Sequence, residues 1–283
     1  MEAERELSLV DDLMAEMQRK MNDQAPWVNE EYLLPYKVGV DLGTSNIVII
    51  VLDQNNRPVA GELEPAHVVR DGIVVEYVQA VTLLRSMKAR LEQRLGTTLT
   101  HAATAIPPGI GSGNVKVITN VVEAAGFEVT HVIDEPEAAA MVLGVVNGAV
   151  VDIGGGTTGI SVIREGQVIL SADEATGGVH MTLVIAGSYG LDFAEAEKLK
   201  HQSGNNRMLL PVVQAVVEKM ADIALKNIPK GTGKIYLAGG SSCLEGIEQI
   251  FAKYTALETV KPVNPLLVTP VGIAMSAGGA AKQ

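Results

Sequence analysis

Residues 150–159 read Val150-Val151-Asp152-Ile153-Gly154-Gly155-Gly156-Thr157-Thr158-Gly159, an apolar strand that enters a turn of three consecutive glycines. Glycine loses more backbone entropy on folding than any other residue, and an ordinary hairpin needs no such run. A backbone that must approach phosphate oxygens closely does need it, because successive amides can then point at the anion. The stretch therefore predicts two strands joined by a phosphate-binding turn.

Two further strand ends have the same character. One reads Val38-Gly39-Val40-Asp41-Leu42-Gly43-Thr44-Ser45-Asn46, where the amides of Gly43, Thr44 and Ser45 can face an anion and Asp41 can hold a hydrated Mg²⁺. The other reads Ile235-Tyr236-Leu237-Ala238-Gly239-Gly240-Ser241-Ser242, and its glycines can seat a base or a sugar. Each turn alone could be only a tight strand end, but three in this order favour one shared ligand.

The strands and helices around these turns form two similar series. Periodicity predicts for the first series strands at 37–42 and 47–52, a strand after 58, a helix at 78–95, a strand at 102–106, a helix at 115–125, a strand at 128–133 and a helix at 136–146. It predicts for the second series strands at 149–153, 160–164 and 168–171, helices at 178–188, 192–202 and 211–226, a strand at 234–237 and helices at 244–254 and 271–281. The repeat predicts an α/β fold of two similar halves with a ligand between them. The domain bounds that we expect are 36–147 plus 270–283 for the first and 148–269 for the second.

Residues 1–35 differ from this body, because they hold nine acidic and three basic residues. An apolar stripe recurs at helical spacing and consists of Val10, Leu13, Met14, Met17 and Met21. The stretch that follows contains Pro26 and Pro35 and is typical of a linker. The amphipathic helix either packs on its own domain or docks on a partner. The long linker and the adaptable methionines favour docking, which predicts that residues 1–35 are dispensable for folding.

Composition excludes several classes of function. The 283 residues include 22 Lys and Arg against 33 Asp and Glu, a formal net charge of −11, which is unfavourable for binding nucleic acid or an anionic membrane by charge. The single cysteine excludes an intrachain disulfide. No stretch approaches the ~20 apolar residues of a membrane span, and no signal peptide opens the sequence, so the cytoplasm is the expected location.

The three turns, in this order, resemble the superfamily of actin, hexokinase and the DnaK-type chaperones, whose two ribonuclease-H-like domains enclose ATP and Mg²⁺. Asp41-Leu-Gly-Thr-Ser and Asp152-Ile-Gly-Gly-Gly-Thr-Thr match its two phosphate motifs, and Leu237-Ala-Gly-Gly-Ser-Ser matches its adenosine motif. Asp134-Glu135-Pro136-Glu137-Ala138-Ala139-Ala140 is similar to the first connecting helix of the DnaK type. The compact size, the missing insertion between Ala60 and Asp71 and the acidic N-terminal arm look like the EutJ family of ethanolamine-utilisation operons.

The resemblance implies a role for each motif residue. Asp41 and Asp152 would organise Mg²⁺, and Glu135 would orient the attacking water, with Asp152 sharing the role of base. The residues that would contact the nucleotide are Gly43, Thr44 and Ser45 on the β-phosphate side, Gly154, Gly155, Gly156 and Thr157 on the γ-phosphate side, Gly239, Gly240 and Ser242 at the nucleoside, and Glu197 and Lys200 at the ribose.

Three departures from the chaperone pattern point to slow chemistry. Gly159 replaces an aspartate, Cys243 replaces an arginine that stacks on adenine, and the catalytic lysine has no counterpart. The resemblance therefore implies a protein that binds ATP and ADP with Mg²⁺ and hydrolyses ATP slowly, as a chaperone for ethanolamine ammonia-lyase or the microcompartment that houses it. The alternative is a non-enzymatic, actin-like scaffold that uses the nucleotide only as a conformational ligand.

Overall fold

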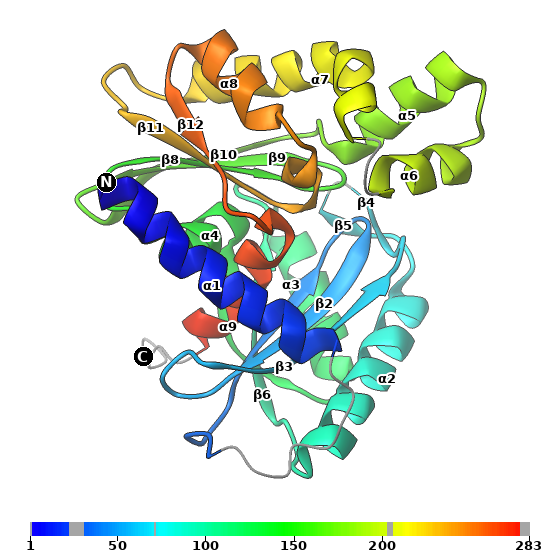
Figure 1. Ribbon diagram of the computed structural model, residues 1–283. Coiled ribbons are helices and arrows are strands. Elements are labelled where there is room, and N and C mark those ends of the chain that lie inside the picture. Colours follow the sequence, from blue (N-terminus) through cyan, green and yellow to red (C-terminus); the bar gives the residue numbers. More distant parts are fainter. Residues whose placement is uncertain (1, 23–30, 71, 203–205, 278–283) are drawn as a thin grey trace.

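Two five-stranded sheets with the same strand order build two lobes (Figure 1). The computed structural model describes residues 2–22, 31–70, 72–202 and 206–277, so parts of the predicted linker and of the helix predicted at 271–281 lie outside the described residues. The first sheet has the order β3-β2-β1-β6-β7 and the second the order β10-β9-β8-β11-β12. In each sheet the first three strands in sequence are antiparallel and the other two run parallel to the first. The predicted fold class, two ribonuclease-H-like halves, is confirmed.

The strands lie close to their predicted positions. Their bounds are β1 Lys37–Leu42, β2 Asn46–Leu52, β3 Pro58–Pro65, β6 His101–Ile106 and β7 Glu128–Asp134 in the first lobe, and β8 Gly148–Ile153, β9 Thr158–Arg164, β10 Gln167–Glu174, β11 Lys234–Ala238 and β12 Glu258–Val260 in the second. A two-stranded hairpin, β4 Val69–Arg70 and β5 Ile73–Val74, was not predicted. Neither was β12, because three residues are too few to show an alternating pattern.

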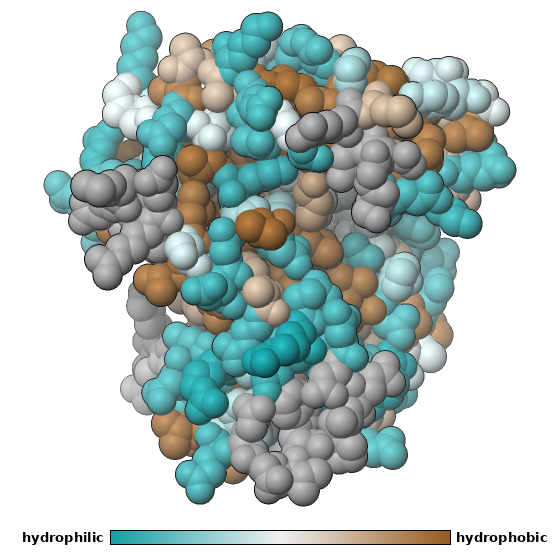
Figure 2. Space-filling model, viewed as in Figure 1, coloured by the Kyte–Doolittle hydropathy of each residue, from teal (hydrophilic) through white to brown (hydrophobic). Residues whose placement is uncertain are grey.

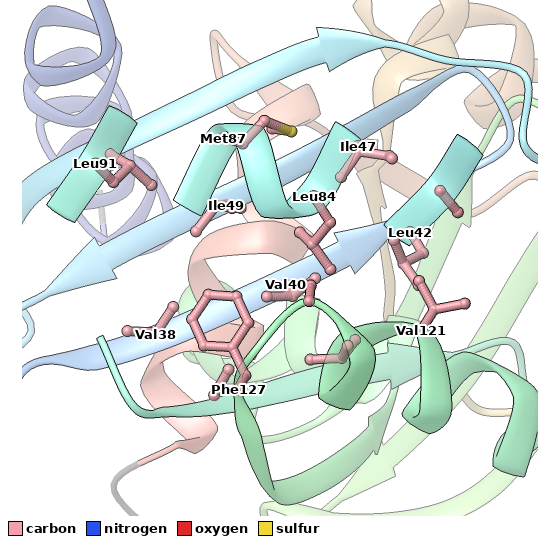
Figure 3. Packing of buried hydrophobic residues seen from close by; sticks show 14 of the residues in the cluster. Val38, Val40, Leu42, Ile47, Ile49, Leu84, Met87, Leu91, Val121 and Phe127 are labelled. Carbon is pink, nitrogen blue, oxygen red and sulfur yellow. The ribbon is translucent and has the colours of Figure 1, made fainter. Parts of the chain in front are cut away.

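Helices cover the outer face of each sheet. In the first lobe α2 (Tyr77–Leu95) and α3 (Ser112–Ala124) lie over β-branched side chains such as Val38, Val40 and Ile49, with Leu84 and Phe127 between them (Figure 3). The helices of the second lobe are α5 Gly178–Tyr189, α6 Phe193–His201, α7 Asn206–Asn227 and α8 Ile247–Thr255. The predicted start of α7 at Pro211 is wrong, because this proline lies inside the helix. None of the helices described here is long and apolar enough to cross a membrane.

Two helices connect the lobes. They are α4 (Glu135–Leu143) and α9 (Val268–Ser276), and one buried cluster joins them to residues of both sheets, including Val48 of β2 and Val150 of β8. A Cβ on Gly272 would lie 2.0 Å from the carbonyl oxygen of Ala138, so only glycine allows α9 to approach α4 this closely. The junction between the lobes is therefore a tightly packed helix pair.

The amphipathic helix α1 (Glu2–Asn22) packs on the molecule's own core. Met14 and Met17 are fully buried, and Gly61 of β3 leaves the space into which Met21 reaches. Near the other lobe, Asp11 Oδ1 accepts a hydrogen bond of 2.7 Å from the Val263 amide. The apolar stripe of α1 covers the face of β2 and β3 that α9 leaves open. The expectation that this stripe is free to dock on a partner is therefore wrong.

The outer surface of α1 agrees with this packing. Figure 2 shows mainly hydrophilic side chains over the middle of α1 on the face that it presents to solvent. Of the two readings of the N-terminal helix, the structure supports the one in which it completes the fold.

Candidate functional site

A cavity of about 430 Å³ lies where the carboxyl ends of β1, β8 and β11 meet between the lobes. Its lining includes all the residues predicted for the site except Ser242, namely Asp41, Gly43, Thr44, Ser45, Glu135, Asp152, Gly154, Gly155, Gly156, Thr157, Glu197, Lys200, Gly239 and Gly240. Strand ends of both sheets thus bring side chains more than 100 residues apart in sequence to one place.

Two turns, the first phosphate-type turn (residues 43–45) and the triple-glycine turn (residues 154–156), face each other across this cavity. A Cβ on Gly155 would lie 2.4 Å from Ser45 Oγ and 3.3 Å from the Thr44 Cβ. The Ser45 carbonyl in turn accepts a hydrogen bond of 3.0 Å from the Ala66 amide, which ties the first turn to the end of β3. The run of small residues therefore serves the close approach of two turns, one from each lobe.

The triple-glycine turn is held from behind through its carbonyls. The Gly154 carbonyl accepts from the Gly178 amide at 2.9 Å and from Ser241 Oγ at 2.8 Å, and the Gly155 carbonyl accepts from the Val179 amide at 2.8 Å. Within the described residues, no hydrogen bond is donated by the amides of Gly155, Gly156 or Thr157. Since a buried N–H without a partner is unfavourable, these amides suit an anion in the cavity.

Three acidic side chains converge on the same cavity. Burial raises the pKa of Asp41 to about 7, and the charge of Asp152 adds to the effect. Burial also raises the pKa of Asp152 to about 6, although the hydrogen bond from the Thr269 hydroxyl acts in the opposite direction. The pKa of Glu135 is raised well above its usual value, first by burial and then by the charges of Asp41 and Asp152. A cation near this group would favour its ionised form.

The arrangement fits Mg²⁺ better than a metal held by protein ligands alone. The described residues contain no group of three His, Cys, Asp or Glu side chains that could hold a metal ion. Magnesium usually keeps several waters and binds through one or two carboxylates together with phosphates of a substrate. Asp41 and Asp152 can supply those carboxylates, with the turn amides close by for the phosphates.

Glu197 and Lys200, predicted at the ribose, are joined to each other. Lys200 Nζ donates to Glu197 Oε2 and to Thr182 Oγ1, both at 2.8 Å, and to the Gly178 carbonyl at 3.2 Å. His201 Nε2 lies 3.0 Å from the second carboxylate oxygen of Glu197. Burial opposes ionisation of Glu197, but the contacts with His201, Lys200 and Thr182 outweigh it and lower the pKa to about 2. The pair therefore braces the start of α5 against α6 at the cavity wall.

The third turn departs from expectation at one residue. Gly239 has a φ of 84°, and a Cβ there would lie 2.2 Å from Asp152 Oδ1, so glycine is required. Residues Gly240–Cys243 form a 3₁₀ turn that aims Ser241 and Cys243 at the cavity. Ser242 is buried and donates to the Ala238 carbonyl at 2.6 Å, so its assignment to the nucleoside contact is wrong.

Thr269 and His67 are among the cavity residues that the sequence analysis missed. Thr269 lies at the start of α9 and donates to Asp152, but a lone threonine before a helix carries no signal in the sequence. His67 lines the cavity from the link between β3 and β4. The alternation of the buried Ala66 and Val68 with the exposed His67 could have indicated it.

Comparisons with known proteins agree with this architecture. The profile of the MreB/Mbl protein family matches residues 59–202, and that of the type IV pilus assembly protein PilM matches residues 144–271. The ethanolamine utilization protein EutJ of Salmonella typhimurium is 47% identical over 86% of this chain and 86% of its own length. The chain belongs to the EutJ family.

Further relatives support the same assignment. EutJ of Escherichia coli K12 is 44% identical over 90% of this chain and 89% of its own length. The crystal structure of EutJ from Carboxydothermus hydrogenoformans is 43% identical, covers 95% of this chain and 98% of its own, and superposes with a TM-score of 0.88. MreB 5 of Spiroplasma citri bound to AMPPNP, at 18% identity, shares the fold, with a TM-score of 0.69 over 86% of this chain and 95% of its own. The EutJ family thus lies in the actin and HSP70 ATPase superfamily, as the motifs predicted.

Proposed function

We propose that this EutJ-family chain binds ATP and ADP together with Mg²⁺ in the cavity between its lobes. One observation carries the proposal: each lobe brings a glycine turn and a strand-end carboxylate to the same cavity, and amides of the triple-glycine turn have no partner there among the residues that the structure describes. The fold neighbour MreB 5 of Spiroplasma citri is described with AMPPNP and with ADP, which supports the same class of ligand.

The residues divide the work of binding between the lobes. Amides of the turn at residues 155–157 would donate to phosphate oxygens, and the hydroxyls of Thr44 and Ser45 could donate from the other side. Asp41 and Asp152 would hold the metal through its waters. Bound Mg²⁺ would supply the positive charge that lets phosphates lie beside these carboxylates.

Hydrolysis at this site would be slow. The only lysine or arginine among the described residues of the cavity wall is Lys200, and Glu197 already engages it. No such side chain is then left to stabilise charge on a phosphoryl group in transfer. Glu135 has a pKa well above its usual value, which suits a carboxylate that accepts a proton near neutral pH.

The phosphate-release rate of Glu135→Gln separates a slow ATPase from a scaffold that only binds nucleotide. General-base help is worth typically 10²–10⁴-fold, so we expect the variant to lose at least about tenfold in rate at similar ATP affinity. The matched control is Glu137→Gln, an exposed position on the same helix. A Glu135→Gln protein as active as the wild type would place the base elsewhere, and a wild-type rate no higher than the background of buffer alone would support the scaffold function.

The proposed biological role rests on the name of the relatives. Because they are ethanolamine utilization proteins, we infer a chaperone-like role in that process, with an ethanolamine-utilisation enzyme such as ethanolamine ammonia-lyase, or a microcompartment protein, as the partner. The chain would then act in the cytoplasm or in association with the microcompartment. Closure of the lobes on nucleotide would change the surface that the partner contacts.

Calorimetric titration with ATP and ADP, with and without Mg²⁺, tests the binding. A charged hydrogen-bonding group contributes about 1.5–3 kcal/mol, so Asp152→Asn should weaken Mg²⁺-dependent binding by about tenfold or more. Asp12→Asn, on the exposed side of α1, is the matched control and should bind like the wild type. Wild-type protein that binds neither nucleotide at millimolar concentration would contradict the proposed function.

A further inference from the structure

His67 occupies a constrained position beside the first phosphate-type turn. Its neighbours in sequence, Ala66 and Val68, are buried in the core of the first lobe. The Ala66 amide donates to the Ser45 carbonyl at 3.0 Å, and the Val68 carbonyl accepts from the Val75 amide at 2.8 Å. Because successive side chains of an extended segment point to opposite sides, these anchors turn the imidazole of His67 toward the cavity that it lines.

His67 differs from the other basic side chains of the cavity wall in its ion pairing. Among the described residues of the wall, the basic side chains are His67, Lys200 and His201. Lys200 and His201 both contact the carboxylate of Glu197, on the second lobe. His67 has no such ion pair in the described structure and is the one basic side chain that the first lobe contributes there.

We propose, on the basis of the nucleotide-binding function above, that His67 binds a phosphate of the nucleotide as an imidazolium and takes up a proton when the nucleotide binds. Histidine is the side chain whose charge changes most readily near neutral pH. A phosphate within hydrogen-bonding distance favours the charged form, and the imidazolium donates a hydrogen bond to it. Nucleotide binding and protonation of His67 are therefore coupled, and the share of the binding free energy that His67 contributes grows as the pH falls.

Other titratable groups face the same cavity and set the background against which His67 acts. They are Asp41 from β1, Glu135 from α4, Asp152 from β8, Glu197, Lys200 and His201 from α6, and Cys243 from the 3₁₀ turn. On the segment of His67 itself, Glu64 pairs with Arg90 at 2.7 Å, and Arg70 is exposed. The carboxylates can release protons when Mg²⁺ binds. The proton uptake that is due to His67 is therefore the difference in proton uptake between the wild type and a His67 variant.

The test is calorimetric titration with Mg²⁺ and ADP in two buffers of different ionisation enthalpy, which gives the number of protons taken up. At pH 7, ADP binding to His67→Gln should take up fewer protons than ADP binding to the wild type. At pH 6, His67→Gln should bind ADP about tenfold more weakly than the wild type, and the ADP affinities of the two proteins should converge at pH 8. His67→Lys should keep strong binding with a weaker dependence on pH. His101→Gln, at the other end of the first sheet, is the matched control and should behave like the wild type.

A second measurement uses the wild-type protein alone. The chain has five histidines, so the imidazole resonance of His67 can be assigned by its absence from His67→Gln. Its chemical shift should move toward that of an imidazolium when ADP and Mg²⁺ are added, and adenosine should not produce this change. ADP binding with an unchanged His67 resonance, or equal proton uptake in His67→Gln and wild type, overturns the role of His67 alone. Failure of the wild type to bind ADP overturns both proposals.

Discussion

Asp41, Asp152 and Glu135 make the cation-free protein sensitive to pH. The folded pKa of Asp41 is about 7 and that of Asp152 about 6, against 3.8 for the unpaired group. Between pH 4 and pH 7 the folded state therefore binds more protons than the unfolded state. The free energy of unfolding must then fall as the pH rises through this window, because the unfolded chain ionises more readily.

We expect Mg²⁺ to counter this loss. In EDTA, the wild type should melt at a lower temperature at pH 8 than at pH 5.5, and Asp41→Asn should show a smaller decrease. Added Mg²⁺ should raise the melting temperature of the wild type more at pH 8 than at pH 5.5, since protons compete with the metal. Thermal melts of both proteins, with Asp12→Asn as the control, measure this. Parallel pH profiles for the wild type and Asp41→Asn would rule out the coupling.

At the scale of single residues, the sequence predicted which residues lie in the glycine turns better than it predicted which way each side chain points. Gly154, Gly155 and Gly239 line the cavity because a turn that follows a strand has few alternative places. Ser241 and Ser242 are neighbours of the same type, and only the 3₁₀ geometry decides that Ser241 lines the cavity while Ser242 is buried. Composition and residue spacing do not predict this difference between the directions of the two serine side chains.

At the scale of elements, α1 is the helix whose role differs most from expectation. Met14 is fully buried, whereas Leu9 on the same helix is 71% exposed. Met14→Ala should lower the free energy of unfolding by about 2–5 kcal/mol, because it leaves a cavity against the first sheet. Leu9→Ala should change it by less than about 0.5 kcal/mol. Denaturant titration measures both, and unchanged stability of Met14→Ala would restore the view that α1 is a detachable docking helix.

The crossing of α4 and α9 offers a second matched pair. Gly272→Ala places a Cβ 2.0 Å from the Ala138 carbonyl oxygen and should destabilise the protein by about 1–3 kcal/mol, because backbone must move. Gly187→Ala, in the exposed part of α5 with nothing within 4 Å, should stabilise it by up to about 1 kcal/mol through helix propensity. The denaturation midpoints of the two variants should therefore move in opposite directions. A higher midpoint for Gly272→Ala would show that the helices do not pack this tightly.

How well a helix or strand could be predicted from the sequence depended on its length. Long periodic segments such as α2, and buried strands such as β2 and β8, were found within a few residues. The short β12 and the β4–β5 hairpin were not, because two or three residues carry no period. The burial of α1 could not be derived either, since an apolar stripe does not say which surface it covers.

At the scale of the whole molecule, the internal repeat predicted two similar halves with a ligand between them. The two sheets have matching strand orders, and their glycine turns meet at one cavity. The sequence alone could not show that the connecting helices and α1 form a shared core with both sheets, because those contacts join segments far apart in the chain. The central claim is that one nucleotide is held by both lobes.

Hydrogen exchange in the presence and absence of ADP and Mg²⁺ tests this claim most directly. The amides of Gly155, Gly156 and Thr157 donate no hydrogen bond within the described structure, so nucleotide phosphates should slow their exchange. We predict slower exchange in peptides from both turns, residues 42–46 in the first lobe and 153–158 in the second, with no change at residues 183–189 of α5. Protection confined to one lobe, or absent from both turns, would contradict a nucleotide clamped between the lobes.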